Sequence, residues 1–226
     1  GRVTRSTKLP SVICVGNRQF MVGEHAYNLK ADLKLGKNIW YGFKDNLGQL
    51  EQITYPESVL DGHARVPINN AKSGLITLLK HILEEVKLYI KKNNLPPDIY
   101  FSVSIPANFP DYKKIQLREC LNLSGMKYED SSFVFEPVSA LVYALYNEDT
   151  IINKNGESQN ILILDIGAGT LDASVLSINT DGDEIEADIL AVERINEIGG
   201  DKVDEMIYDE LGEELLDNFS KEVLIH

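Results

Sequence analysis

The chain has 226 residues, of which 43% are hydrophobic, so it can bury one large core or the cores of two lobes. Its 35 acidic and 22 basic residues give a formal net charge of -13 and include no cluster of Lys and Arg, which argues against a nucleic-acid partner. No apolar stretch is long enough to span a bilayer and the first ten residues lack a secretory signal, so we expect a cytoplasmic protein without a membrane partner.

The N-terminal part of the sequence predicts a β-hairpin followed by a short helix. Residues 11–15 and 19–23 have the composition of strands. Between them, Gly16 and Asn17 tolerate the positive φ that tight hairpins require. A short helix is expected near residues 24–29.

The next part of the chain is irregular and is followed by a strong helix signal. Residues 31–67 mix turn signals with brief apolar pieces, so we assign no elements there. Asn69 or Asn70 can cap a helix whose apolar residues keep a helical period until the stretch NNLPP at residues 93–97.

Strands and helices then alternate along the chain. Residues 99–106 and 131–137 have the pattern of strands, and residues 111–125 between them have the pattern of a helix that ends at a glycine. Pro137 suits the first turn of a further helix, which puts Glu136 at the carboxyl end of a strand. The alternation predicts a largely parallel sheet.

A second unit is expected after the polar stretch at residues 147–160, which has the composition of a connection between lobes. Residues 161–164 form the continuous apolar run ILIL, which is typical of a central strand covered on both faces. Two further strands are expected at residues 170–178 and 184–192, joined by an Asp-Gly hairpin signal. The second of them alternates apolar and polar residues except at Leu190.

The sequence DIGAGT, which follows that apolar run, predicts a phosphate-binding turn. Gly167 and Gly169 allow successive backbone N–H groups to face one concavity, where they can bind phosphate oxygens. Asp165 and the Thr170 hydroxyl flank this turn, and a carboxylate there suits Mg2+, directly or through a water. The alternative is a plain hairpin whose glycines permit the turn and whose aspartate accepts backbone N–H bonds.

The histidines and cysteines support no other kind of site. The four histidines form no triad with a serine and have no metal-ligand spacing. Cys14 and Cys120 lie far apart, which suits a reducing compartment and argues against both zinc and a disulfide framework.

Four motifs occur in one order at plausible spacings: VSIPANFPDYKKIQLRECLNLSG, FEPVSALVYAL, DIGAGTLDASVL and IGGDKVDEMI. Together they resemble the DnaK-type heat-shock protein 70 family. The opening stretch RSTKLPSVICVGNRQFMVGEHAYN is similar to the segment with which that family leaves its first phosphate hairpin. The Asp-Gly turn is shared by the wider actin-like ATPase superfamily, whereas the IPANF and EP segments are more specific to the chaperones. Only residues 31–67 align poorly.

The resemblance implies an α/β protein with the actin-like ATPase (ribonuclease-H-like) fold, in which two lobes clamp the nucleotide. Residues 1–154 would be the first lobe, with residues 31–67 as an irregular subdomain, and residues 155–226 would begin the second lobe. The family's first phosphate hairpin would precede Gly1 and its adenosine-binding segments would follow His226. We therefore expect the chain to be a fragment whose first lobe lacks its opening hairpin.

The function implied by the resemblance is that of the nucleotide-binding domain of a molecular chaperone of the stress response. Such a domain binds and hydrolyses Mg-ATP, and the resulting lobe closure controls the binding of client proteins, with co-chaperones as further partners. As a fragment, the chain is expected to be an inactive hydrolase by itself. Two alternatives stay open: a divergent relative that acts as a non-catalytic interaction module, and an actin-like ATPase that forms filaments.

The resemblance also assigns roles around the turn. Asp165 matches the aspartate that holds Mg2+ through water, and Thr170 matches the hydroxyl near the terminal phosphate. Gly167 and Gly169 match the phosphate-loop glycines. Ala168 replaces a glycine that is common between them, which narrows the allowed backbone but keeps the N–H donor.

Further site residues follow from the other motifs. Glu136 matches an interlobe glutamate that places the metal-bound water, and Asp172 matches a second acid that could equally stabilise the loop by hydrogen bonding. Gly199 and Gly200 match a glycine pair near the phosphates, with a plain loop into a helix as the alternative. Pro106 matches a proline that acts as a conformational switch.

The catalytic lysine of the family is the hardest residue to transfer. Lys34 is our candidate and Lys37 its rival, since a lysine there would offset phosphate charge as water attacks. A surface lysine is the alternative. Lys114 stands where the family commonly has an arginine, so any forked hydrogen bonding is lost there.

Overall fold

A computed structural model provides the coordinates of the chain. The residues described below are 9–16, 19–30, 32–33, 35–48, 58–60, 64–66, 68–129, 132–147, 158–167, 170–181, 184–196, 200, 203, 206–207 and 209. The chain divides into two compact units, which are described separately: Gly1–Val103 with Phe109–Ser132, and Ser104–Asn108 with Phe133–His226. The lobe boundary expected after residue 154 stays a prediction.

The first unit opens with a small antiparallel sheet, as the sequence predicts. Strands β1 (Ile13–Gly16) and β2 (Gln19–Val22) form the predicted hairpin, and α1 (Glu24–Tyr27) is the predicted short helix. β3 (Ile39–Trp40) pairs with the other edge of β1, which gives the strand order β2-β1-β3. β1 is therefore the central strand, and it contributes Ile13 and Val15 to the core of this unit.

Short elements occupy parts of the region in which the sequence assigned none. Besides β3, this region contains α2 (Phe43–Asn46) and the antiparallel pair β4 (Ser58–Leu60) and β5 (Ala64–Val66). None has more than four residues, too few for a period to be recognised. β3 and α2 contribute Trp40 and Phe43 to a core that also contains Ile13, Val15, Ile68 and Leu78.

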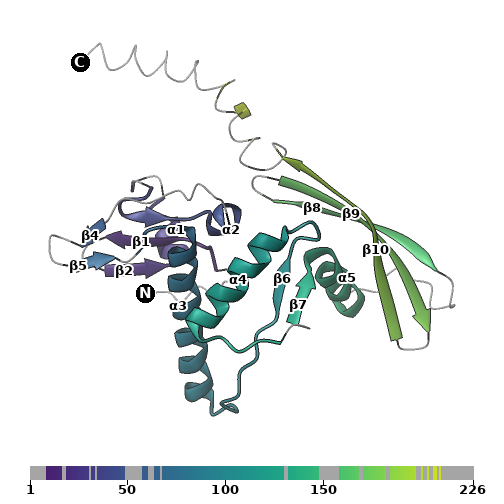
Figure 1. The fold of residues 1–226 in the computed structure, drawn as a ribbon, viewed down its shortest axis with the longest axis horizontal. Coiled ribbons are helices and arrows are strands. Elements are labelled where there is room, and N and C mark those ends of the chain that lie inside the picture. The colour runs from purple at the N-terminus through teal and green to yellow at the C-terminus, as the bar shows by residue number, and fades with distance from the viewer. Residues whose placement is uncertain are drawn as a thin grey trace. The chain divides into compact units, whose positions relative to one another are not determined.

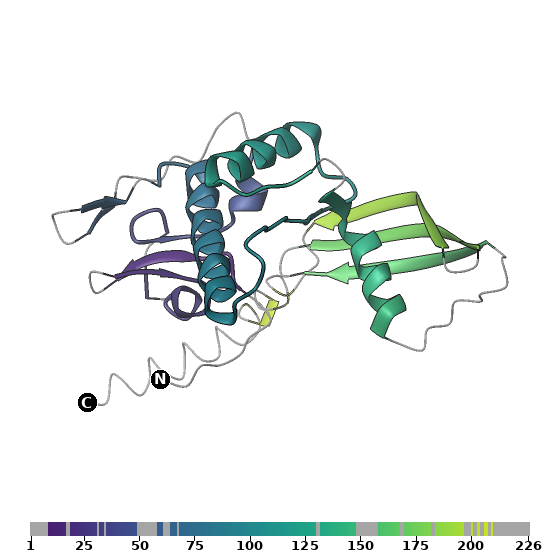
Figure 2. The ribbon, with the colours of Figure 1, turned by 90° about the horizontal axis from the view of Figure 1, so that it is seen from below.

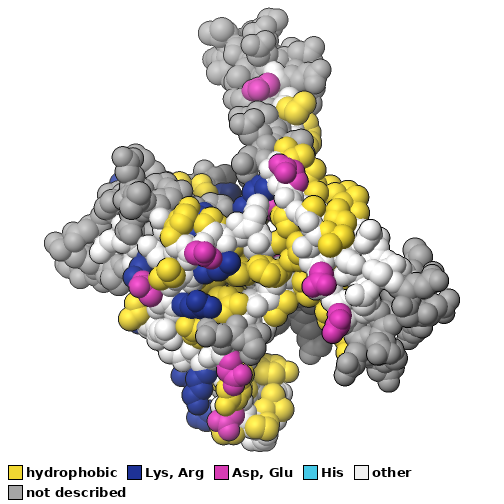
Figure 3. Space-filling view, turned by 45° about the vertical axis from the view of Figure 1, so that its right-hand side comes forward, with side chains coloured by type: hydrophobic (Ala, Val, Ile, Leu, Met, Phe, Trp, Pro, Cys, Tyr) yellow, Lys and Arg dark blue, Asp and Glu magenta, His cyan; other side chains and the backbone are white. Residues whose placement is uncertain are grey.

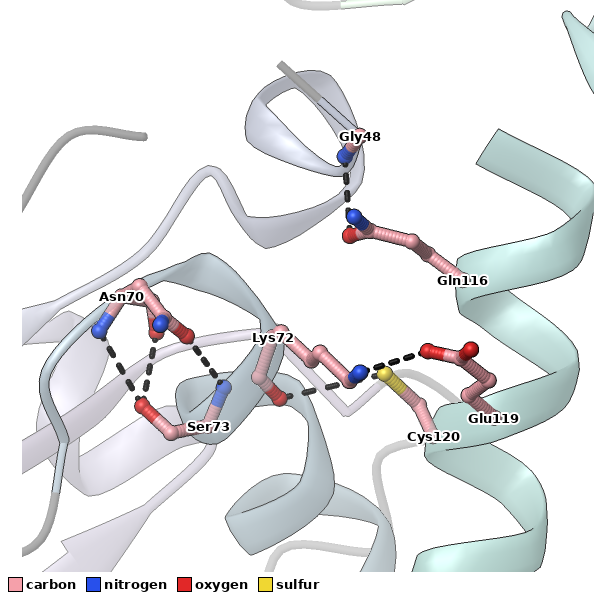
Figure 4. A network of polar contacts seen from close by, with 7 residues as sticks. All are labelled: Gly48, Asn70, Lys72, Ser73, Gln116, Glu119 and Cys120. Atoms are coloured by element: carbon pink, nitrogen blue, oxygen red, sulfur yellow. Dashed lines mark hydrogen bonds and ion pairs between the residues drawn. The ribbon is translucent and has the colours of Figure 1, made fainter. Parts of the chain in front are cut away.

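The long helix α3 (Ala71–Asn93) starts and ends where the sequence predicts. The Asn70 side chain accepts a hydrogen bond from the Ser73 N–H at 2.8 Å, and the Ser73 hydroxyl accepts one from the Asn70 N–H at 3.1 Å (Figure 4). At the other end, Asn94 takes the left-handed conformation with φ of 52° and stops the helix. Of the two predicted caps, Asn70 is the correct one.

Helix α4 (Asp111–Ser124), also predicted, lies beside α3 in the first unit (Figure 1). Lys72 and Glu119 form an ion pair between the two helices, and the buried Cys120 thiol lies 3.8 Å from the Lys72 carbonyl oxygen (Figure 4). Burial raises the pKa of the Cys120 thiol to about 11. At neutral pH this cysteine is therefore a small apolar residue of the helix interface.

Gly74 in α3 lets the Phe43 ring approach the helix backbone. A Cβ built on Gly74 would lie 2.3 Å from Phe43 Cε1, and Phe43 is almost fully buried.

Replacing Gly74 by Ala improves helix propensity by up to about 1 kcal/mol, but overpacking a core costs about 1–3 kcal/mol. We expect Gly74→Ala to lower the free energy of unfolding by roughly 1 kcal/mol, measured by urea denaturation. The control Lys87→Ala, on the exposed face of the same helix, should change it by less than about 0.5 kcal/mol. A Gly74→Ala protein more stable than the wild type would contradict this packing.

The described residues of the second unit form two sheets and the helix α5. β6 (Val103–Ile105), which begins at the boundary between the units, pairs with β7 (Phe133–Phe135), and α5 (Glu136–Asn147) follows β7 directly. Within the described residues, the sheet of β6 and β7 has two strands, fewer than the largely parallel sheet predicted from the alternation would have. Glu136 lies at the junction of β7 and α5, as predicted.

The second unit also contains a three-stranded antiparallel sheet. β8 (Gln159–Ile166), β9 (Thr170–Asp181) and β10 (Glu184–Asn196) follow one another along the chain and have the order β10-β9-β8. The pairing of β9 with β10 shifts by one residue between Ile189 and Ala191. This bulge lies at Leu190, where the sequence interrupts the alternation of apolar and polar residues.

The prediction that the ILIL run is a central strand covered on both faces is wrong. β8 lies at one edge of the strand order, and its burial alternates with a period of two. Ile161 and Ile163 pack with Leu141 of α5, which covers one face of the sheet (Figure 2). On the opposite face, Leu162 and Leu164 are 60% and 56% exposed. Only every second residue of the apolar run therefore faces the core.

In the described part of the chain, no helix combines the length and the hydropathy needed to cross a membrane. On the face drawn in Figure 3, acidic side chains are scattered among hydrophobic and uncharged ones. Near the C-terminal end of the described residues, the backbone is helical at Gly200, Val203, Met206, Ile207 and Asp209.

Candidate functional site

The second unit contains a pocket of about 240 Å³. It is formed where the end of β6, the start of α5 and one face of the three-stranded sheet meet. Its lining residues are Pro106, Ala107, Glu136, Pro137, Ala140, Ile163, Leu164, Asp165, Asp172, Ser174 and Val192. Residues from four separate parts of the sequence thus surround one space.

Four residues that the sequence selected for different reasons line this pocket together. Pro106 follows β6, Glu136 begins α5, Asp165 is near the end of β8, and Asp172 is near the start of β9. Asp165 and Asp172 are direct partners across the antiparallel pairing of β8 and β9, so their side chains lie on the same face of the sheet. The pocket therefore has an acidic wall built from three carboxylates.

The predicted phosphate turn joins β8 to β9 beside this wall. The Gly167 N–H donates to the Thr170 carbonyl oxygen at 2.9 Å, and the Gly200 N–H donates to the Gly167 carbonyl oxygen at 3.1 Å. Gly200, from the predicted glycine pair, is thus bound to the turn. Because the Gly167 N–H closes the turn, a phosphate there needs other donors. The remaining residues of the motif, Ala168 and Gly169, lie outside the described residues, as does Gly199.

Asp172 has two partners, one of which the sequence did not indicate. Arg194 on β10 donates from Nε to Asp172 Oδ1 at 2.7 Å and from Nη2 to Asp172 Oδ2 at 2.9 Å. The Thr170 hydroxyl lies 3.4 Å from Asp172 Oδ2. Both charged side chains are largely buried, with Arg194 26% and Asp172 19% exposed. Asp172 thus has the hydrogen-bond partners that are required by the alternative in which it stabilises the loop.

Arg194 escaped the sequence analysis because its partner depends on the register of a hairpin. Near the turn, Asp181 pairs with Glu184, and counting back without an irregularity would put Glu193 opposite Asp172. The bulge at Leu190 shifts the pairing by one residue and puts Arg194 there instead. The break in the alternation of apolar and polar residues at Leu190 was the signal from which this shift could have been predicted.

The chemistry of the pocket fits a hydrated divalent cation. The described residues contain no group of three or more His, Cys, Asp or Glu side chains placed to hold a metal ion by themselves. Mg2+ commonly uses only one or two carboxylates, keeps several waters and takes the rest of its ligands from phosphate. Asp165 is exposed to solvent and lines the pocket, so its carboxylate can accept hydrogen bonds from such waters. The carboxylates of the pocket therefore fit Mg2+ that is bound largely through water.

Of the predicted lysines, Lys114 and Lys37 belong to the first unit and are not among the residues that line this pocket. Lys114 lies in the first unit on α4, where its ammonium group is 3.2 Å from Asp111 Oδ1. Lys37 is an exposed residue of the same unit. Lys34 lies outside the described residues, so the identity of the catalytic lysine stays a prediction.

The comparison with protein families agrees with the motifs. The family model described as Hsp70 protein matches residues 71–223. The match runs from the start of α3 beyond the end of β10, so it includes every residue that lines the pocket. Since it also covers more than half of the sequence, the chain belongs to the Hsp70 family of chaperones.

Proposed function

We propose that this chain is part of the nucleotide-binding domain of a DnaK-like chaperone, in which Mg-ATP is bound and hydrolysed. Lobe closure would then control a protein-substrate site, with client proteins and co-chaperones as partners. The observation that carries the proposal is the convergence of Glu136, Asp165 and Asp172 with the phosphate turn in one pocket. The buried thiols of Cys14 and Cys120 support a reducing compartment such as the cytoplasm.

Each residue of the pocket would act through a simple interaction. Asp165 would orient the waters of the bound Mg2+, and Glu136 would accept a hydrogen bond from the water that attacks the terminal phosphate. The Thr170 hydroxyl would lie near the terminal phosphate, held there by the hydrogen bond that it donates to Asp172. Since Gly167 uses its N–H to close the turn, Ala168 and Gly169 would supply the backbone donors to phosphate.

The metal would supply positive charge beside the phosphates. Of the three carboxylates that line the pocket, Arg194 neutralises only Asp172, so the charge of Glu136 and Asp165 would repel a bare polyphosphate. When bound, Mg2+ offsets the phosphate charge and stabilises charge that develops during transfer. The proposal therefore requires nucleotide binding to depend on the divalent cation.

Calorimetry on the full-length natural protein tests the proposal. We expect ATP and ADP to bind in the presence of Mg2+, binding to weaken by at least about tenfold in EDTA, and bound ATP to be hydrolysed in a single-turnover assay. Binding without hydrolysis would favour the non-catalytic interaction module. Assembly into filaments on addition of ATP, seen by light scattering, would favour the filament-forming ATPase. Absence of any nucleotide binding would exclude the proposed function.

A further inference from the structure

We propose that Arg194 is a positioning residue of this site, which holds Asp172 and, through it, the Thr170 hydroxyl beside the phosphate turn. The inference rests on the proposed function and adds a residue that none of the motifs contains. It makes Asp172 the second member of a chain of contacts that runs from β10 to the turn. Its direct consequence is that Arg194 acts on turnover without contacting the nucleotide.

The geometry of the ion pair restricts the Asp172 carboxylate. Two parallel N–H···O bonds at 2.7 and 2.9 Å fix the plane of the carboxylate as well as its position. A lysine could provide only one point of attachment, whereas the planar guanidinium provides two. The carboxylate is thus held in one orientation, with Oδ2 turned toward both Arg194 and the Thr170 hydroxyl.

The order of charges across the sheet gives Arg194 a second effect. Asp165, Asp172 and Arg194 are successive partners across β8, β9 and β10, so two like charges and one opposite charge form a row on one face. Directly opposite like charges repel each other across antiparallel strands. Arg194 neutralises Asp172, which leaves Asp165 as the acidic partner for the hydrated cation. Losing Arg194 would return a third unbalanced carboxylate to the pocket.

A purely structural cross-strand pair is the competing explanation. Such a pair would tie β9 to β10 and change the stability of the sheet, but it would leave the chemistry of the turn unchanged once the protein is folded. A positioning role makes two different demands. The effect of Arg194→Ala on turnover must vanish when Asp172 is replaced by a residue that cannot form the ion pair. Turnover must also be lost when the two charges are exchanged between β9 and β10.

The test uses four variants of the full-length natural protein: Arg194→Ala, Asp172→Asn, the combination of these two, and the exchange Asp172→Arg with Arg194→Asp. Single-turnover hydrolysis of Mg-ATP, the dissociation constant of Mg-ATP and the urea midpoint are measured for each. Lys72→Ala is the matched control, because it breaks a partly exposed ion pair in the other unit. It should shift the midpoint slightly and leave hydrolysis unchanged.

We expect Arg194→Ala to lower the hydrolysis rate by on the order of tenfold or more, since small displacements of a positioned group have effects of this size. The dissociation constant should change by less than about threefold, because the arginine does not contact the nucleotide. In the Asp172→Asn background, Arg194→Ala should have no further effect on the rate. The exchange should restore the urea midpoint but not the rate, because a guanidinium then faces the Thr170 hydroxyl and cannot accept its hydrogen bond.

Each contrary result overturns a defined statement. Normal hydrolysis by Arg194→Ala, or recovery of hydrolysis in the exchanged protein, would show that the pair is only structural. A loss of rate that persists in the Asp172→Asn background would show that Arg194 acts directly on the ligand. If the wild-type protein neither binds nor hydrolyses Mg-ATP, the proposed function and this inference both fail. If the wild-type protein is active and only the variants contradict the expectation, this inference alone fails.

Discussion

Asp165→Asn is expected to lower ATP turnover by on the order of a few hundredfold in the full-length natural protein. The substitution keeps the size of the side chain but removes the charge that orders the waters of Mg2+ in the pocket. Loss of one electrostatic contact in a preorganised site typically costs about 3–4 kcal/mol of transition-state stabilisation. Because Asp165 is exposed to solvent and faces Asp172, the free energy of unfolding should change by about 1 kcal/mol or less, with either sign.

Single-turnover hydrolysis and urea unfolding, measured side by side, test this expectation. Asp188→Asn is the matched control, since Asp188 is an exposed strand aspartate of the same sheet that does not line the pocket. It should change neither quantity appreciably. Near-normal turnover with a strongly lowered unfolding midpoint for Asp165→Asn would mean that this carboxylate only stabilises the turn.

Trp40→Ala should have the largest effect on stability, a loss of about 3–5 kcal/mol in the free energy of unfolding of the first unit. Trp40 lies on β3, is fully buried and belongs to the same core as Ile13 and Phe43. Truncation to Ala would leave a cavity between the small sheet and α3, and a well-packed core collapses into such a space only in part. A loss of this size is comparable with the whole stability of many domains.

The control for this prediction is Trp40→Phe. The Trp40 indole N–H has no hydrogen-bond partner within the described part of the chain, so its removal breaks no hydrogen bond that the structure shows. Phe removes that donor and keeps most of the ring, and we expect a loss of about 2 kcal/mol or less. Urea unfolding followed by far-UV circular dichroism measures both variants. Equal losses for Ala and Phe would show that the indole shape is critical and not the filled volume.

The elements in which an apolar pattern repeats several times could be predicted from the sequence, whereas short elements whose position depends on packing could not. α3 is recognisable because Asn70 is a strong cap and the apolar residues repeat over many turns. The hairpin of β9 and β10 is recognisable because a turn signal separates two strands. α2 contains four residues, and its position depends on the contact between Phe43 and Gly74, which no local pattern encodes.

The candidate site shows the same division. Glu136, Asp165 and Asp172 were selected from separate motifs, and they line one pocket because each lies near the end of a strand or the start of a helix. Arg194 was missed because a register beyond a bulge cannot be counted from the turn alone. The ILIL run was misjudged because apolarity on both faces of a strand does not say that both faces are covered.

The buried position of Trp40 also determines what optical spectroscopy can report. The chain has a single tryptophan, which lies in the first unit, whereas the pocket residues belong to the second. Its emission maximum should therefore follow the opening of the first unit alone as the indole moves from the core into water. Circular dichroism records the backbone of both units at once. A denaturation curve in which the two signals separate would measure directly how independently the two halves of this chain unfold.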